Sequence, residues 1–249
     1  MTKKHSPTGR YWLIGVIALL VLLVFLLVQM PVAWLLGMQA EQGRFRLLSA
    51  TGNLISGTGV WEFRSQNNEN QTRFLRGQVQ WQLSLSGLLT TKPYTVTVSQ
   101  GDSQLSGQAS FDGRLVRLYQ WSGKITPDSL KAAVGLSVDQ PVVVHELSGV
   151  MAATPELTGR ATLDAAQITY HVAGLTGGVK MPALTAQMSV MPEAQGTQIQ
   201  VSSPAGTVAQ IAWGANQIHI GITYRLIKEM TGVSIPITDD DTVVMEMVR

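Results

Sequence analysis

The feature that most constrains this sequence is a long apolar segment close to its amino terminus. Tyr11 to Val28 includes no charged or amide side chain over eighteen positions, and Gln29 is the first strongly polar residue that follows. A helix rises about 1.5 Å per residue, so a segment of this length reaches across roughly 30 Å of hydrocarbon. The sequence therefore predicts one transmembrane helix over residues 11–36, with Tyr11 and Val28 bounding its apolar part.

The charges beside this segment predict its orientation. Lys3, Lys4 and Arg10 precede it, and positive charge that closely flanks a membrane helix is retained in the cytoplasm. We therefore expect a cytoplasmic stub over residues 1–10 and export of residues 37–249. A cleaved signal peptide is the alternative, but its apolar region is usually about 7–15 residues long and ends at a small-x-small site. The segment here is longer, and no clean Ala-x-Ala sequence follows it.

Composition narrows the functions open to the exported part. The chain has no cysteine, which excludes disulfides, thiolate metal sites and cysteine nucleophiles. Three of the eighteen basic residues lie in the stub, so fifteen basic residues face sixteen acidic ones beyond Leu36. The exported part is therefore close to neutral, and we expect no nucleic-acid partner, since such a partner requires a basic surface.

From about Phe45 onward, short runs of alternating polar and apolar residues predict β-strands. Gln78 to Leu85 and Tyr94 to Ser99 alternate with period two, as strands with one buried face do. Turn residues recur about every 8 to 12 positions, a spacing typical of an antiparallel meander. We predict a mainly β fold in which an antiparallel, twisted and curved sheet follows the membrane helix. Further strands are expected at residues 107–111, 115–121, 142–145, 159–163, 167–172, 185–190, 197–201, 207–213, 217–222 and 242–247.

The remaining segments predict turns and one or two short helices. The polar tract Gln66 to Gln71 is typical of a hairpin tip, and Gly57-Thr-Gly59 of a turn or bulge. One helix is expected over residues 129–134 with Asp128 as its N-cap. A second is expected over residues 224–230.

Two strand segments resemble each other. Leu105 to Gly113 (LSGQASFDG) and Leu157 to Ala165 (LTGRATLDA) agree in residue class at nearly every position. A duplicated strand-turn unit stacked along one sheet would explain the likeness, and so would common strand chemistry. The sequence leaves both explanations open.

The sequence predicts no catalytic, cofactor-binding or metal-binding residue, and we expect no enzyme. The four histidines, at positions 5, 145, 171 and 219, have no second histidine within four residues, and His145-Glu146 lacks the next ligand of a zinc protease. Asp239-Asp240-Asp241 is the densest acidic cluster, but adjacent side chains on an extended chain diverge, which favours an acidic turn over a cation site.

Two tryptophans stand out on the expected strands. Trp61 and Trp81 are either core aromatics or exposed anchors for a partner. Phe63 lies two residues beyond Trp61 and is therefore expected on the same face.

Several short motifs resemble one known family. Gly52-Asn-Leu-Ile-Ser-Gly57, then Trp81-Gln-Leu83 and Leu88-Leu89, are similar to the start of protein N of the type II secretion system, the GspN family. In that family a Gly-Thr-Leu-Trp-Ser-Gly segment follows a single membrane anchor and precedes a tryptophan strand with a leucine pair. Leu147-Ser-Gly149 and Leu157-Thr-Gly159 look like the Leu-polar-Gly strand starts of the family. The likeness is best over residues 10–113 and marks Gly52, Gly57, Trp61 and Trp81 as motif residues.

This resemblance implies an accessory component of the type II secretion system in the cell inner membrane. It implies a periplasmic carboxy-terminal domain that contacts other secretion components, and no enzymatic activity. A looser likeness, to β-groove proteins that shuttle lipids between membranes, implies lipid as a possible partner. Strands with two apolar faces would favour a sheet that closes within the protein, and one uncovered, concave apolar face would favour the lipid carrier.

Overall fold

The computed structural model describes residues 45–66, 72–84, 93–111, 115–134, 137–152, 154–172, 175–191, 196–214, 217–231 and 242–248. The expected membrane helix over residues 11–36, the leucine pair 88–89 and the acidic cluster 239–241 lie outside these residues. Within the described residues, no helix has the length and apolar character needed to span a membrane.

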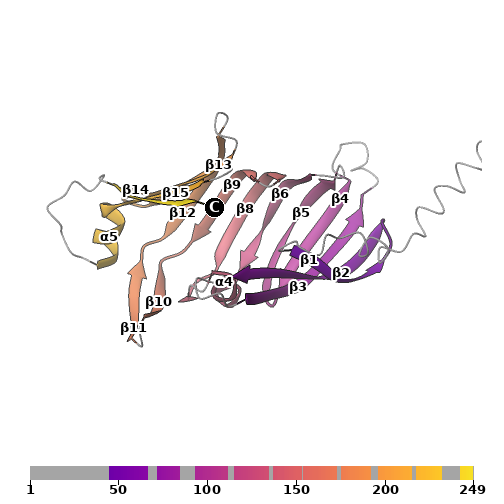
Figure 1. The fold of residues 1–249 in the computed structure, drawn as a ribbon, viewed down its shortest axis with the longest axis horizontal. Coiled ribbons are helices and arrows are strands. Elements are labelled where there is room, and N and C mark those ends of the chain that lie inside the picture. The colour runs from indigo at the N-terminus through magenta and orange to yellow at the C-terminus, as the bar shows by residue number, and fades with distance from the viewer. Residues whose placement is uncertain are drawn as a thin grey trace, which may run out of the picture.

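Thirteen strands form one antiparallel sheet in the order β1-β2-β3-β4-β5-β6-β8-β9-β12-β13-β14-β15-β16. In Figure 1 the central strands β4, β5, β6, β8 and β9 lie side by side, while β1 to β3 at one end and β14 and β15 at the other turn out of their plane. The expected antiparallel meander is confirmed, with two excursions. The strands are β1 (Phe45–Gly52), β2 (Ser56–Gln66), β3 (Thr72–Leu83), β4 (Tyr94–Gln100), β5 (Ser103–Phe111), β6 (Val116–Ile125), β8 (Val142–Met151), β9 (Glu156–Leu163), β12 (Leu184–Met191), β13 (Gly196–Ser203), β14 (Gly206–Trp213), β15 (Gln217–Thr223) and β16 (Thr242–Val248).

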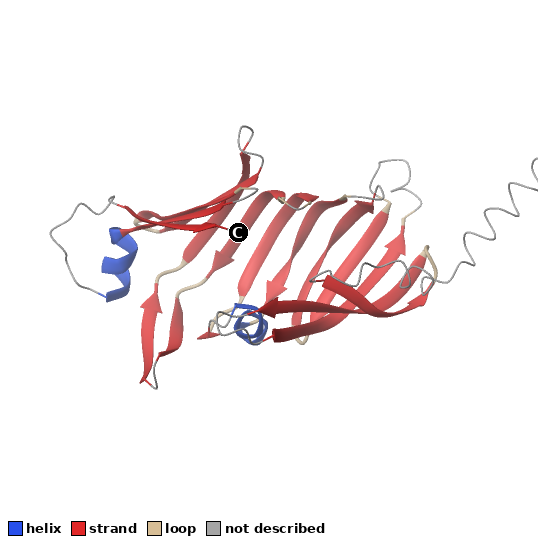
Figure 2. Cartoon of the chain, in the orientation of Figure 1, coloured by secondary structure: helices blue, strands red, loops and turns tan. Residues whose placement is uncertain are grey.

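The excursions supply a small second sheet and one of the two helices of the described region. Helix α4 (Pro127–Val134) and strand β7 (Ser137–Val138) separate β6 from β8, and β10 (Ala166–Val172) and β11 (Leu175–Met181) separate β9 from β12. Strands β11, β10 and β7 pair in that order. Helix α5 (Tyr224–Thr231) follows β15. Figure 2 shows both helices at the margins of the large sheet.

All the strands that the alternation pattern predicts are present, whereas β1, β2, β7 and β11 have no clear pattern. In β1 the doublet Leu47-Leu48 interrupts the alternation, and the pairing register with β2 shifts at this point. Gly57 and Gly59 suggest a turn or bulge, but this prediction is wrong because both lie inside β2 and pair with β3 in unbroken register. Helix α4 begins at Pro127, so Asp128 lies in its first turn and is not its N-cap.

The pairing register gives the large sheet one apolar and one polar face. A single row of mutually paired residues crosses all thirteen strands, and every member is apolar or glycine. The row is Ala50, Gly59, Val79, Val98, Leu105, Gly123, Val144, Ala161, Ala186, Val201, Ala209, Ile222 and Val243. The adjacent row on the opposite face is mostly polar and includes Gln78, Ser99, Gln104, Lys124, Thr162, Thr185 and Ser202.

Tryptophan rings on the apolar face lie across glycines of the neighbouring strands. A Cβ atom added to Gly57, Gly77 or Gly107 would clash with the ring of Trp81, Trp61 or Trp121, respectively. Each indole N–H also donates to a backbone carbonyl, at 3.2 Å for Trp61, 3.0 Å for Trp81 and 2.8 Å for Trp121. The glycines give these rings room to lie flat on the sheet, as aromatic residues do when they cover strand glycines.

The two similar segments, residues 105–113 and 157–165, share a related pairing. Four adjacent strands each carry an apolar–hydroxyl–glycine tripeptide: residues 105–107 in β5, 121–123 in β6, 147–149 in β8 and 157–159 in β9. Within each hairpin the tripeptides pair antiparallel, so that Leu105 lies opposite Gly123 and Leu157 opposite Gly149. The repeated chemistry therefore fits a local packing requirement that recurs along the sheet.

The two central strands of this group, β6 and β8, bulge in the same way. Gln120 and Glu146 have positive φ values of 53° and 52°. The Gln120 amide donates to Ser148 Oγ at 2.8 Å, and the Glu146 amide donates to Ser122 Oγ at 3.0 Å. The reciprocal hydrogen bonds hold both strained residues and bend the middle of the sheet.

We predict that Gly77→Ala destabilises the sheet, because the new methyl group meets the Trp61 ring and the Ser99 carbonyl. Overpacking of this kind costs about 1–3 kcal/mol of unfolding free energy. Gln80→Ala, an exposed change on the same strand, should stay within about 0.5 kcal/mol of wild type. Urea denaturation of residues 37–249 measures both values, and equal stabilities would contradict the proposed ring–glycine packing.

Candidate functional site

A cavity of about 380 Å³ lies on the apolar face where the β2–β3 hairpin curls over β4, β5 and β6. Its volume falls at the lower end of the range of about 300–1,000 Å³ that is usual for small-molecule sites. The lining residues are Trp61, Phe63, Leu75, Val98, Ser99, Gln100, Ser103, Gln104, Leu105, Ile125 and Ser129. Apolar side chains from five strands therefore converge at one place.

The sheet register positions the apolar wall of this cavity. Phe63 pairs with Leu75, and Trp61 with Gly77, which places both aromatics on the same face, as the sequence predicts. Trp61 and Leu75 are 9% and 7% exposed. The core interpretation of Trp61 is thus confirmed, and its ring forms part of a concave surface.

The polar residues beside α4 are bonded to one another. Ser103 Oγ lies 2.9 Å from Thr126 Oγ1 and donates to Ser129 Oγ at 2.8 Å. Ser129 Oγ in turn donates to the Gln100 carbonyl at 3.2 Å, and Ser103 Oγ accepts from the Thr126 amide at 2.7 Å. Both serines are 7% exposed. This network fixes the first turn of α4 against β5 and satisfies the hydroxyl groups of Ser103 and Ser129.

The chemistry of the cavity suits binding better than catalysis. Its lining combines aromatic and aliphatic side chains with serines and two glutamines, and it contains no carboxylate, histidine or basic residue. Such a surface gains free energy by removing apolar ligand surface from water, about 25 cal/mol for each Å² buried.

Three of the motif residues, Gly52, Gly57 and Trp81, form a structural corner outside the cavity lining. Gly52 has a φ of +99°, a conformation that favours glycine, and Asn53 Oδ1 accepts the amides of Ile55 and Ser56 at 2.9 Å each. Trp81 donates to the Asn53 carbonyl and covers Gly57. The structure thus brings Gly52, Gly57 and Trp81 together at the β1–β2 turn.

The remaining lining residues carry no motif. Leu75, Val98, Leu105 and Ile125 show only the period-two alternation common to all strands, and their convergence depends on the curl of the sheet.

His145, for which the sequence predicts no metal, lies on the polar face, and its Nε2 atom is 3.3 Å from Thr162 Oγ1. Among the described residues, no three histidine or acidic side chains group as metal ligands do.

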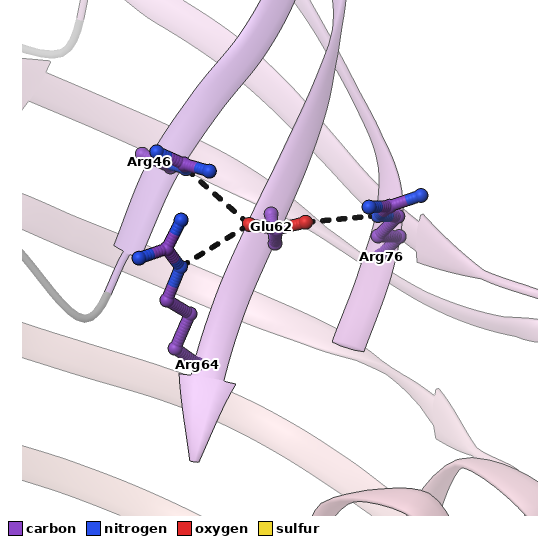
Figure 3. Close-up of polar contacts among 4 residues, drawn as sticks. All are labelled: Arg46, Glu62, Arg64 and Arg76. Carbon is purple, nitrogen blue, oxygen red and sulfur yellow. Dashed lines mark hydrogen bonds and ion pairs between the residues drawn. The ribbon is translucent and has the colours of Figure 1, made fainter. Parts of the chain in front are cut away.

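A second cluster lies on the polar face of β1 to β3. Glu62 is 1% exposed, and three arginines surround it: Arg76 Nε at 2.9 Å, Arg46 Nε at 3.3 Å and Arg64 Nε at 3.4 Å. Figure 3 shows the carboxylate between arginines from both neighbouring strands and from its own strand. The arginine side chains thus shelter Glu62 on the outer surface of the hairpin.

These contacts lower the pKa of Glu62. The hydrogen bond from Arg76 is the largest cause, burial acts in the opposite direction, and the hydrogen bond from Arg64 and the charges of Arg76 and Arg46 add to the lowering. A lowered pKa in the folded state means that the ionised carboxylate stabilises the fold above its unfolded pKa, and that this contribution is lost as pH falls.

The apolar face also carries an exposed rim, formed by the paired residues Phe111, Val116 and Met151 at the ends of β5, β6 and β8. They are 65%, 38% and 46% exposed, respectively. Large apolar groups gathered in this way on a surface are typical of an interaction site.

No protein-family model matches this chain, and no curated protein or solved structure matches it either.

We predict that Glu62→Gln removes a pH-dependent part of the stability. Wild type should lose thermal stability as pH falls below about 4.5, the ordinary pKa of this carboxyl group, whereas the Gln variant should be less stable at neutral pH and respond less to acid. Asp102→Asn removes one negative charge from an exposed turn and should keep the wild-type profile. Thermal unfolding of residues 37–249 between about pH 2.5 and 7 tests this, and parallel profiles for wild type and E62Q would refute it.

Proposed function

We propose that this chain is an accessory component of the type II secretion system, anchored once in the inner membrane. Its amino terminus is cytoplasmic, and residues 37–249 form a periplasmic domain that takes part in the export of folded proteins through contacts with other secretion components. The observation that carries the proposal is the order of its parts. An apolar anchor is followed by the Gly52–Gly57 turn and then by the strand that holds Trp81.

The open sheet supports a role in protein contacts. Of the strands that the structure describes, β1 and β16 each pair on one side only. An unpaired strand edge presents backbone donors and acceptors to which a partner strand can add. Val243 and Val244 on β16 are 40% and 61% exposed, so the edge also offers apolar side chains to a partner.

We predict that a photoreactive amino acid at Val244 of the full-length protein forms crosslinks with secretion components in cells. The same amino acid at Gln187, an exposed position on the interior strand β12, should give few such crosslinks because both edges of that strand are already paired. Mass spectrometry of the adducts identifies the partners. Equal or absent capture at both positions, together with normal secretion after gene deletion, would rule out the proposed role.

A second candidate function is binding or transfer of lipid by the apolar face. The apolar row through all thirteen strands favours this function, because the residues of the row are mostly only half-buried. The same face is also hollowed at the cavity. The polar face has the opposite character, so the sheet is amphipathic over its whole length. A β-groove protein that shields acyl chains from water requires this asymmetry.

We predict that residues 37–249, exported to the periplasm behind a cleavable signal peptide and purified without detergent, retain phospholipid. Organic extraction followed by mass spectrometry should recover lipid in stoichiometric amount. A periplasmic protein without an apolar groove, purified in the same way, is the control for adventitious lipid. Recovery no higher than in that control would exclude the lipid function and leave the secretion function intact.

A further inference from the structure

We propose that the cavity formed by β2 to β6 and α4 holds one acyl chain of a phospholipid taken from the membrane that anchors this protein. The proposal rests on the second candidate function and assigns its ligand class and its site. Three features lead to it: the lining, the bonding of the polar groups, and the place of the cavity along the chain relative to the expected anchor.

The lining matches a hydrocarbon chain. Six apolar side chains, Trp61, Phe63, Leu75, Val98, Leu105 and Ile125, contribute to a space of about 380 Å³. The aromatic rings come from β2, and the aliphatic side chains come from β3, β4, β5 and β6. A flexible chain without polar atoms can follow such a surface and bury its own apolar area at no cost in lost hydrogen bonds.

The polar atoms at the cavity argue against a polar ligand. The hydroxyls of Ser103 and Ser129 bond to each other and to α4 and β4, and the Trp61 indole donates to the Gln78 carbonyl. The surface that the lining presents to the cavity is almost entirely apolar, so a sugar, nucleotide or peptide would lose hydrogen bonds to water there with few to replace them. The lipid headgroup therefore stays outside the cavity and only the acyl chain enters.

The position of the cavity along the chain points to the anchoring membrane as the lipid source. The first residues of β1, Phe45 and Leu47, pair with Phe63 and Trp61, the two aromatic residues of the wall. Eight residues separate position 36, the expected end of the membrane helix, from Phe45. An extended chain of that length spans at most about 30 Å, so the cavity stays within reach of the same bilayer.

Leu105→Trp provides the test, with Leu157→Trp as its matched control. Leu105 in β5 lies opposite Gly123 and lines the cavity. Leu157 in β9 lies opposite Gly149 in the same way, but it is outside the cavity lining. The full-length protein is placed in nanodiscs of phosphatidylethanolamine and phosphatidylglycerol that include a phospholipid with a diazirine in one acyl chain. After irradiation, mass spectrometry locates the adducts, and adducts within residues 11–36 confirm that labelling works.

In wild type, adducts are expected on residues 61–63, 75 and 98–105 as well as on the anchor. L105W should lower the cavity adducts by about tenfold, because the indole occupies the apolar volume that the chain would fill, while L157W leaves them unchanged. Val98→Phe is a second cavity-filling variant, and circular dichroism confirms the fold of each protein. Adducts spread over the whole apolar face and unaffected by L105W would overturn the assigned site but keep the lipid function. Adducts confined to the anchor would overturn both the assigned site and the lipid function.

Discussion

The structure depends on a cross-strand register that keeps one side of a thirteen-stranded sheet apolar from the first strand to the last. A slip of one residue in any strand would move its apolar set to the other face. The row from Ala50 to Val243 contains no polar residue, although the register shifts at several bulges along the sheet. The bulges therefore keep the apolar residues on the same face of the sheet in strands where the alternation of the sequence is interrupted.

Glycines and tryptophans adapt this apolar face to curvature. A ring that lies across a glycine fills the space above two strands with one side chain, and its indole N–H reaches a carbonyl of a neighbouring segment. At Trp61 this arrangement coincides with the curl of the β2–β3 hairpin, and the ring becomes a wall of the cavity. Packing and a candidate binding surface thus arise from the same contact.

The two faces of the β1–β3 region serve different purposes. Glu62 and its three arginines tie these strands together on the polar side, while Trp61, Phe63 and Leu75 face the cavity on the other side. Because the strands next to the expected anchor are joined by charge on one face and by aromatic packing on the other, this end of the sheet can be rigid and still hollow. The edges of the sheet and its apolar face are separate surfaces, so the two proposed functions would use different parts of the domain.

The sequence by itself determined the strand content and the amphipathic character of the domain, because period-two alternation is a local property that each strand carries on its own. It also predicted the helices near residues 129–134 and 224–230 and the shared face of Trp61 and Phe63. It did not delimit β1 and β2, because the Leu47-Leu48 doublet in β1 and the glycines at 57 and 59 in β2 interrupt the alternation of polar and apolar residues. The doublet and the glycines are explained only by the strands that pair with them. Only the tertiary structure decided that Leu75, Val98, Leu105 and Ile125 meet in one cavity and that Glu62 lies among three arginines. Such meetings depend on how far the sheet curls and on pairing between distant residues, which no short stretch of sequence records.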